Sequence, residues 1–188
     1  MLFVLDHERA TDTAEIERLL NSAFGADRTR LTSYRFREDV APLATLGFVA
    51  RAGQRILGSV RCWPIGMRAD NAPPDAACLL GPLAVAPHLR GAGIGTALLR
   101  RSLAAVDEDY PGMPVFLIGD APYYARVGFR QVLPALVRLP GPVAADRLLV
   151  RLPAGQQPSV MPANFALEPV LAAVARDKQQ RFAGYRHL

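Results

Sequence analysis

Three alternating glycines, Gly91, Gly93 and Gly95, follow Arg90 directly and open a predicted helix over 95–106. The first N–H groups of a helix lack intrahelical acceptors and carry partial positive charge, so they attract anions such as phosphates. Glycine tolerates positive φ and removes the Cβ atom that would hold an anion away from the backbone. Arginine adds a permanent positive charge. The stretch RGAGIG is therefore predicted to bind an anion through its main chain.

Other interpretations of this loop compete. A glycine-rich turn needs no ligand at all. A dinucleotide-binding fingerprint has the spacing GxGxxG directly after a strand, whereas Thr96 stands here in place of the third glycine and APHLR separates strand from loop. Asp120 could contact a ribose, although it could equally cap the turn that follows it. A Walker loop requires GKS or GKT, which this stretch lacks.

The elements expected around this loop form a mixed α/β domain. Strand 78–85, helix 95–106 and strand 114–119 make a βαβ unit whose two strands should be parallel, with a right-handed crossover. Upstream, the patterns predict a strand at 2–5, a helix over 11–25 capped by Asp12 and ended by Gly25, a weak helix over 28–39, a hairpin over 46–65 and a loop over 71–77. Downstream, they predict helical turns at 121–128, strands within 129–139 and 144–153, and an amphipathic helix over 167–182.

Composition narrows the class of protein. The chain has 188 residues, about one domain's length, and 51% hydrophobic residues, which argues against disorder. The net charge of +5 permits an anionic partner, but its densest groups, 28–37 and 99–103, have no nucleic-acid-binding module around them. Two cysteines without CxxC spacing and three dispersed histidines do not resemble a metal site. No signal peptide and no long apolar run is present, so we expect no membrane partner and a cytoplasmic location.

Two motifs together carry a family resemblance. LAVAPHLRGAGIGTALL resembles the signature R/Q-x-x-G-x-G/A of the GCN5-related N-acetyltransferase (GNAT) superfamily, met by Arg90, Gly93 and Gly95. YYARVGF is similar to that family's Y-x-x-x-G-F, met by Tyr124, Gly128 and Phe129. GPLAV with GDAPYYARVGF resembles a bacterial subgroup of uncharacterised acetyltransferases. The resemblance covers 79–133 and implies a mixed, mostly antiparallel twisted sheet, with the parallel βαβ unit at its centre and helices flanking it.

The resemblance implies acetyl-CoA as cosubstrate, without a metal. Its pantetheine arm would bond to the strand at Leu83, Ala84 and Val85. Its pyrophosphate would bind the loop of Arg90, Gly91, Ala92, Gly93, Ile94, Gly95 and Thr96. The residues agree with this, because Pro82 has no N–H and a kink at Gly81-Pro82 could open a slot between 78–85 and 114–119. The alternative for Gly81-Pro82 is a simple turn at the strand's entry.

The implied reaction moves an acetyl group to a primary amine of a small molecule or peptide. Tyr124 is the candidate general acid for the departing thiolate, and its alternative role is packing or hydrogen bonding to the sulfur. Transfer from a free tyrosine, pKa about 10, to a thiolate, pKa about 8.5, is uphill by roughly 2 kcal/mol. The sequence does not identify the general base. Five side chains are conceivable, namely Glu38, Asp39, Asp75, His88 and Asp120, besides a water chain or no base at all.

The acceptor should enter near SYRFRED, RCWPIGM and the C-terminal extension. Four arginines there, Arg35, Arg37, Arg61 and Arg68, hint at an acidic group on the acceptor. Trp63 is expected either in the core or as an apolar wall of the pocket.

We divide the chain into a GNAT domain over 1–140 and an extension over 141–188 of strand and helix, which either covers the acceptor site or pairs two subunits of a homodimer. The alternative functions are a non-catalytic CoA- or acyl-CoA-binding sensor or scaffold, and an NAD-binding oxidoreductase.

Overall fold

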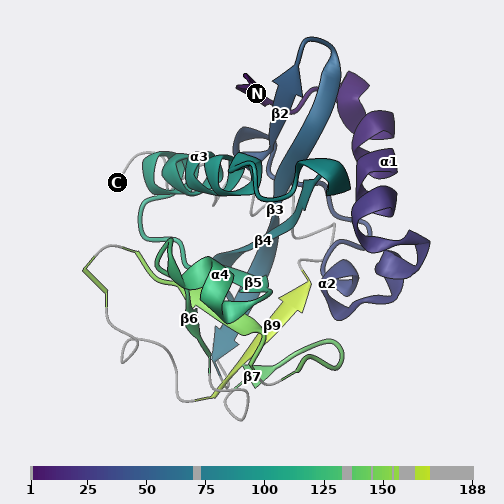
Figure 1. Cartoon of the computed structure of the whole chain (residues 1–188). Helices are drawn as coiled ribbons and strands as arrows, with labels where there is room; N and C mark the ends of the chain where they lie inside the picture. Colours follow the sequence, from purple (N-terminus) through teal and green to yellow (C-terminus); the bar gives the residue numbers. More distant parts are fainter. Residues whose placement is uncertain are drawn as a thin grey trace.

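One sheet organises the molecule, with helices on both of its faces (Figure 1). The computed structural model describes residues 2–69, 73–132, 137–144, 146–153, 155–156 and 164–169. Its strands are β1 (Val4–His7), β2 (Phe48–Ala52), β3 (Arg55–Ala69), β4 (Asp75–Val85), β5 (Val115–Ile118), β6 (Arg130–Gln131), β7 (Val137–Arg138), β8 (Leu148–Arg151) and β9 (Phe165–Pro169). Its α-helices are α1 (Thr13–Phe24), α2 (Thr32–Arg35), α3 (Ile94–Asp109) and α4 (Ala121–Ala125).

The strand order is β1-β2-β3-β4-β5-β8-β6, and β9 pairs with both β3 and β7. Neighbouring strands are antiparallel except in the pairs β4–β5 and β7–β9. The βαβ unit is therefore β4, α3 and β5, with the parallel pairing that the sequence predicted. The expected mixed, mostly antiparallel sheet with flanking helices is confirmed.

The alternation of side chains along β2 explains why two helices cover opposite faces. Phe48 and Ala50 pack in one cluster with Leu98 of α3, whereas Val49 packs in another with Ile16 and Leu20 of α1. Successive residues of a strand point to opposite faces of its sheet. In α1 the buried residues Ile16, Leu19 and Leu20 follow the helical period that the sequence displayed. The sheet is thus the middle layer, with α1 and α3 on its two sides.

Three predictions about the elements are wrong. Asp12 does not cap α1 with its side chain; its carboxylate instead accepts the Arg9 backbone N–H at 2.8 Å and pairs with Arg51. Residues 75–77, expected in a loop, open β4 because β3 continues to Ala69 and pairs with them. Residues 167–169, expected to begin a helix, belong to β9, because they pair with β3 from Ile65 to Met67. The remainder of that predicted helix, 170–182, lies outside the described residues.

Other expectations hold with small changes. The hairpin over 46–65 is β2 with β3, the helix over 95–106 is α3, and Gly25 ends α1 with φ +86°. Of the predicted strand within 129–139, the described parts form β6 and β7. The division at residue 140 stays a prediction; among the described residues beyond it, β8 and β9 are both hydrogen bonded into the same sheet.

Candidate active site

The two parallel strands separate shortly after they meet. β4 pairs with β5 only at Cys78–Val115 and Leu79–Phe116. Beyond that point the register between β3 and β4 shifts, with Val60 opposite Leu83 but Cys62 opposite Leu80. The extra residue lies in β4 around Gly81, whose φ is +128°, a value that favours glycine. The predicted opening between the two strands is confirmed, and its cause is this bulge.

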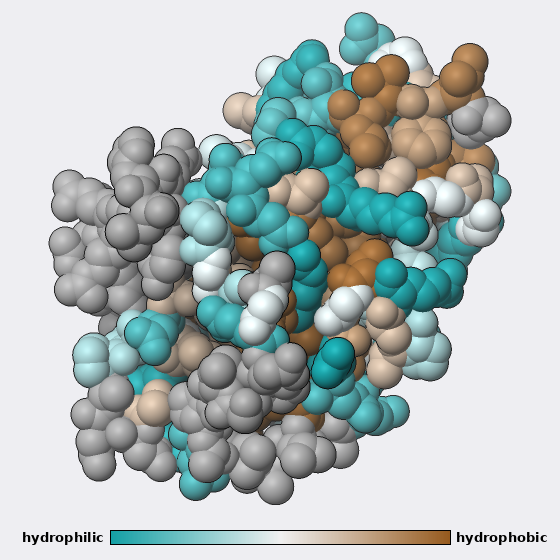
Figure 2. All heavy atoms as spheres, turned by 90° about the vertical axis from the view of Figure 1, so that its left-hand side faces the viewer, coloured by the Kyte–Doolittle hydropathy of each residue, from teal (hydrophilic) through white to brown (hydrophobic). Residues whose placement is uncertain are grey.

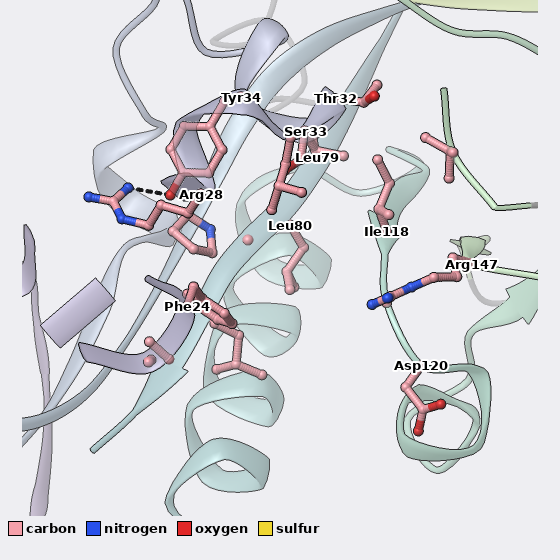
Figure 3. A pocket seen from close by; sticks show the side chains of 18 of the residues that line it. Phe24, Arg28, Thr32, Ser33, Tyr34, Leu79, Leu80, Ile118, Asp120 and Arg147 are labelled. Carbon is pink, nitrogen blue, oxygen red and sulfur yellow. Dashed lines mark hydrogen bonds between the residues drawn. The ribbon is translucent and has the colours of Figure 1, made fainter. Parts of the chain in front are cut away.

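A cavity of about 950 Å³ occupies the opening. One wall is β4 from Leu79 to Val85, and the opposite wall runs from Ile118 to Tyr124 at the end of β5 and the start of α4. A third wall comes from the end of α1 and the segment leading into α2, and residues 142–144 with Arg147 complete the lining. Figure 3 shows Ile118, Asp120 and Arg147 across the space from Phe24, Arg28 and Tyr34, with Leu79 and Leu80 between them.

Leu83, Ala84 and Val85 line the cavity along the free edge of β4. On the other edge Ala84 lies opposite Ser59 of β3, and the Ala86 N–H donates to the Leu57 carbonyl at 2.8 Å. Because N–H groups alternate between the two edges of a strand, those of Leu83 and Val85 point away from β3. Since β5 does not pair with this half of β4, the two N–H groups face the cavity. The open edge can therefore accept an extended ligand as if it were another strand.

The glycine loop continues from this edge, and Arg90 is its one member that lines the cavity. Gly91 and Gly93 have φ of +85° and +81°, and an added Cβ would meet no atom within 4 Å at either residue. Here glycine is needed for the backbone conformation and leaves the amides open to solvent. Arg90 Nη2 donates to the Ala23 carbonyl at 3.1 Å, which ties the loop to the end of α1. Gly93 caps α3, so helix geometry leaves the N–H groups of its first turn without intrahelical acceptors.

Gly95 has a different role from the one its spacing suggested. A Cβ there would lie 2.8 Å from the Tyr123 hydroxyl oxygen and 3.4 Å from Val85 Cγ2. The third glycine is therefore required by the packing of α4 against α3. Tyr123 is a packing residue, and Arg126 stacks on its ring at 5.3 Å.

Tyr124 lies on the cavity wall opposite the free edge of β4. Its ring meets Tyr123 and Phe129 edge to face, with centroids 4.9 and 5.8 Å apart. A Cβ on Gly119 would lie 2.4 Å from Tyr124 Cε2, so the absent side chain of Gly119 leaves room for the ring. Burial raises the pKa of Tyr124 to about 12, with Tyr123 and Asp120 adding to the effect and Arg147 opposing it. The Tyr124 hydroxyl therefore stays protonated at neutral pH and can donate a hydrogen bond.

Of the five conceivable bases, only Asp120 lines the cavity. It occupies the N-cap position of α4, where its side chain makes no capping hydrogen bond. Glu38 and Asp39 are exposed after α2, Asp75 is exposed at the start of β4, and His88 is exposed in the turn before the glycine loop. Asp120 is exposed as well, so its place on the cavity wall is what selects it from that set.

The four arginines of the expected acceptor side separate into two groups. Arg61 binds the Glu8 carboxylate through two nitrogens at 2.8 and 2.7 Å, Arg68 pairs with Glu168, and Arg35 donates to the Pro140 carbonyl at 2.5 Å. Arg37 alone lines the cavity. Trp63 is buried with Phe36 and Leu79 and does not line the cavity, so it is a core residue rather than a wall.

Sequence reasoning missed the segment around Arg147, which reaches the cavity only because the strand β8 that follows pairs with β5. In Figure 3 its guanidinium extends from the wall into the space above Asp120. No local pattern marks these residues, since neither a motif nor a periodicity connects them to the loop at 90–95. Their placement is a property of the sheet order.

Two further properties bear on what the site could bind. Within the described ranges, no group of three or more His, Cys, Asp or Glu is arranged to hold a metal ion, and no helix is long and apolar enough to cross a membrane. On the face shown in Figure 2 the described surface is largely hydrophilic, with apolar residues gathered at its upper right. Phe24 and Leu31, 50% and 56% exposed, are large apolar residues that line the cavity.

Comparisons with known proteins agree with this fold. A model of the acetyltransferase (GNAT) domain matches residues 44–131. The GNAT-family N-acetyltransferase YhbS from Escherichia coli, solved in complex with CoA, is similar with a TM-score of 0.70 and 23% identity, over 87% of this chain and 88% of that one. A GNAT acetyltransferase from Brucella melitensis in complex with acetyl-CoA is similar with a TM-score of 0.62 and 23% identity, over 92% of this chain and 98% of that one. Naa50 from Arabidopsis thaliana, in complex with the bisubstrate analogue CoA-Ac-MVNAL, is similar with a TM-score of 0.56 and 16% identity, over 80% of this chain and 99% of that one. No curated protein sequence matches the chain.

Proposed function

Because the chain belongs to the GCN5-related N-acetyltransferase superfamily, we propose that it binds acetyl-CoA between β4 and β5 and transfers the acetyl group to a primary amine. The acceptor is a small molecule or a peptide. The observation that carries the proposal is the free edge of β4 at Leu83–Val85, which faces the cavity between the glycine loop and Tyr124.

The residues present fit this cosubstrate. Val85 offers its N–H group to an amide of the pantetheine arm, Leu83 offers its N–H group to the thioester carbonyl, and Ala84 lies between them. In the loop from Arg90 through Gly91, Ala92, Gly93, Ile94 and Gly95 to Thr96, the Arg90 and Ala92 N–H groups donate to the Pro87 and Leu89 carbonyls. The other amides of the loop and the positive charge of Arg90 can bind a pyrophosphate. Complexes of the Escherichia coli and Brucella relatives with CoA and acetyl-CoA support the same ligand here.

The chemistry assigns one task to each wall. A thioester supplies an activated acetyl carbon, which an unprotonated amine attacks to form the C–N bond as the C–S bond breaks. The Leu83 N–H donates to the carbonyl oxygen as negative charge develops on it. Tyr124 donates to the departing sulfur, and the proton lost by the amine nitrogen balances the free thiol. Asp120 can accept that proton and pass it on, since it lies at the same end of the cavity.

Thiol release with a panel of amines tests the proposal directly. We expect free thiol to appear only when both acetyl-CoA and an acceptor are present, at a rate proportional to enzyme concentration. Calorimetry with acetyl-CoA alone is the companion measurement. A chain that binds acetyl-CoA but acetylates none of the amines would instead be the alternative, a non-catalytic sensor or scaffold for CoA or acyl-CoA. A chain that does not bind acetyl-CoA would refute both functions.

Gly93→Ala should weaken acetyl-CoA binding about tenfold, because alanine resists the φ of +81° and its Cβ displaces the loop amides. The matched control is Gly112→Ala, where φ is +90° in a turn beyond the end of α3 and an added Cβ also meets nothing within 4 Å. Both variants should lose about 1 kcal/mol of stability, but only Gly93→Ala should change the Kd for acetyl-CoA. Equal affinities of the two variants for acetyl-CoA would show that the loop is not part of the binding site.

A further inference from the structure

One arginine at the cavity has buried nitrogens without hydrogen-bond partners among the described residues, whereas Arg147, which also lines the cavity, is exposed. Arg37 Nε and Nη1 are buried, and neither has a hydrogen-bond acceptor within the part of the chain that the structure describes. Its Nη2 lies 3.6 Å from the point where a Cβ on Gly81 would be, so the guanidinium abuts the bulge of β4. Leaving a buried charged group without a partner is costly, and such a group is a candidate for binding an external ligand.

The surrounding charges do not neutralise it. Arg28 and Arg61 share Glu17, and Arg61 also binds Glu8. Three arginines therefore face two carboxylates, and one positive charge remains. No described carboxylate lies within ion-pair distance of Arg37, so the excess charge rests there. Because Arg37 lines the cavity, an anion entering it would meet this charge.

Aromatic rings hold the guanidinium in a fixed position. Its central carbon lies 4.3 Å from the ring centroid of Tyr34 and 5.6 Å from that of Trp63. The Tyr34 hydroxyl is itself fixed by Arg28. Burial lowers the pKa of Arg37 to about 10, with the Tyr34 hydroxyl opposing the effect and Arg28 and Arg61 adding to it, so the side chain still carries its charge at neutral pH. A guanidinium held in this way can bind a carboxylate with little loss of side-chain entropy.

We propose that Arg37 binds a carboxylate of the acceptor, and that the acceptor is an amino acid or a similarly small amino acid-like molecule. This rests on the proposed acetyl transfer. Gly81 precedes Leu83 by two residues, roughly 7 Å along a strand, so the anion site and the expected acetyl carbon are close neighbours. A molecule with its amine and carboxylate only a few bonds apart can reach both. The exposed side chains of Phe24 and Leu31 favour an apolar side chain on that molecule.

A matched pair of acceptors tests the charge alone. Leucine and leucinamide have the same side chain and amine but differ in the carboxylate. We expect kcat/KM to be at least about tenfold higher for leucine, the usual worth of a hydrogen bond to a charged group. The ammonium group of leucinamide has a lower pKa than that of leucine, so more of its amine is unprotonated at neutral pH. This difference favours leucinamide and therefore works against the expected result. Equal or better use of leucinamide would overturn the proposal.

Two substitutions locate the effect. Arg37→Met keeps an apolar chain against Tyr34 and Trp63 but removes the charge, and it should bring the leucine-to-leucinamide ratio to within about twofold. Arg37→Lys keeps the charge and should retain part of the preference. The control is Arg30→Met, which removes a side chain that is 84% exposed and should leave the ratio unchanged. An unchanged ratio in Arg37→Met would refute the assignment.

A binding measurement separates this proposal from the proposed function. Trp63 is the single tryptophan of the chain and lies beside Arg37, so its fluorescence should respond when Arg37 is occupied. In the presence of CoA, N-acetylleucine should change this signal at concentrations at least about tenfold below those needed with N-acetylleucinamide. This titration needs no turnover and no variant. If the chain acetylates none of the amines, the proposed function is refuted but the carboxylate site at Arg37 is not. If the two ligands change the fluorescence equally, the carboxylate site at Arg37 is refuted.

Discussion

Replacing Tyr124 by phenylalanine should lower kcat about 100-fold while changing the Kd for acetyl-CoA by less than about twofold. The substitution removes only the hydroxyl. The ring keeps its edge-to-face contacts with Tyr123 and Phe129 and its place over Gly119, so the cavity should keep its shape. Steady-state kinetics with saturating acceptor, together with calorimetry for acetyl-CoA, measure the two effects separately.

Tyr123→Phe is the matched control, because Tyr123 also lines the cavity and its hydroxyl packs against Gly95. It should change kcat by less than about threefold. Loss of acetyl-CoA binding in Tyr124→Phe would mean that the hydroxyl belongs to the binding site and not to the reaction.

The raised pKa of Tyr124 refines its role. With a pKa of about 12, complete transfer of its proton to a thiolate would be uphill by roughly 5 kcal/mol, compared with about 2 kcal/mol for a free tyrosine. A hydrogen bond to the sulfur is therefore favoured over full proton transfer. Since the hydroxyl stays protonated until pH approaches 12, activity should rise as the acceptor amine deprotonates and should not fall on account of Tyr124 below about pH 10. A decline that begins near neutral pH, and disappears in Tyr124→Phe, would contradict this assignment.

Gly58→Ala should destabilise the fold by about 2 kcal/mol and lower Tm by roughly 4–8 °C. An added Cβ would lie 2.9 Å from the Ala84 carbonyl oxygen, 2.9 Å from Leu98 Cδ1 and 3.0 Å from Ile94 Cγ2. Backbone and helix must therefore move apart at the point where the start of α3 packs on the paired strands β3 and β4. The same movement should weaken acetyl-CoA binding by at least about fivefold.

Gly47→Ala provides the comparison for this overpacking. Its nearest neighbour would be a Glu8 side-chain oxygen at 3.4 Å, which is an ordinary van der Waals contact. That variant should remain within about 1 kcal/mol of the parent protein and bind acetyl-CoA normally. Thermal unfolding with and without ligand measures both quantities. A Gly58→Ala protein as stable as Gly47→Ala would show that α3 sits less tightly on β3 than the structure indicates.

Local patterns predicted the central part of the fold well. The buried run Val115–Ile118 became β5, and the periodic apolar positions of α1 and α3 became their buried faces. Each of these signals is contained in a few neighbouring residues, where hydrophobic period and terminal glycines decide the element. The opening between β4 and β5 was also foreseeable, since a proline in a strand removes a ladder hydrogen bond.

The remainder depended on partners far away in the chain. β9 resembles the start of an amphipathic helix, and only its pairing with β3 makes it a strand. Gly95 fits an anion-binding pattern, yet the residue that requires it is Tyr123, which follows 28 positions later. Arg37 shares its residue type with three other arginines nearby, and only the placement of their partners distinguishes it, namely Glu8 and Glu17 for Arg61, Glu168 for Arg68 and the Pro140 carbonyl for Arg35. Spacing in sequence carries no information about which charges will find partners.

The position of β8 between β5 and β6 has a consequence for synthesis on the ribosome. β5 is made early, yet its second edge stays open until Leu148–Arg151 has been translated, about thirty residues later. An apolar strand with an open edge attracts other strands, so nascent chains stalled in this interval should be the most prone to aggregate. The third wall of the cavity is completed in the same step, through the bond from Thr32 to the Pro142 carbonyl. Acquisition of acceptor specificity and protection of the sheet should therefore coincide in time.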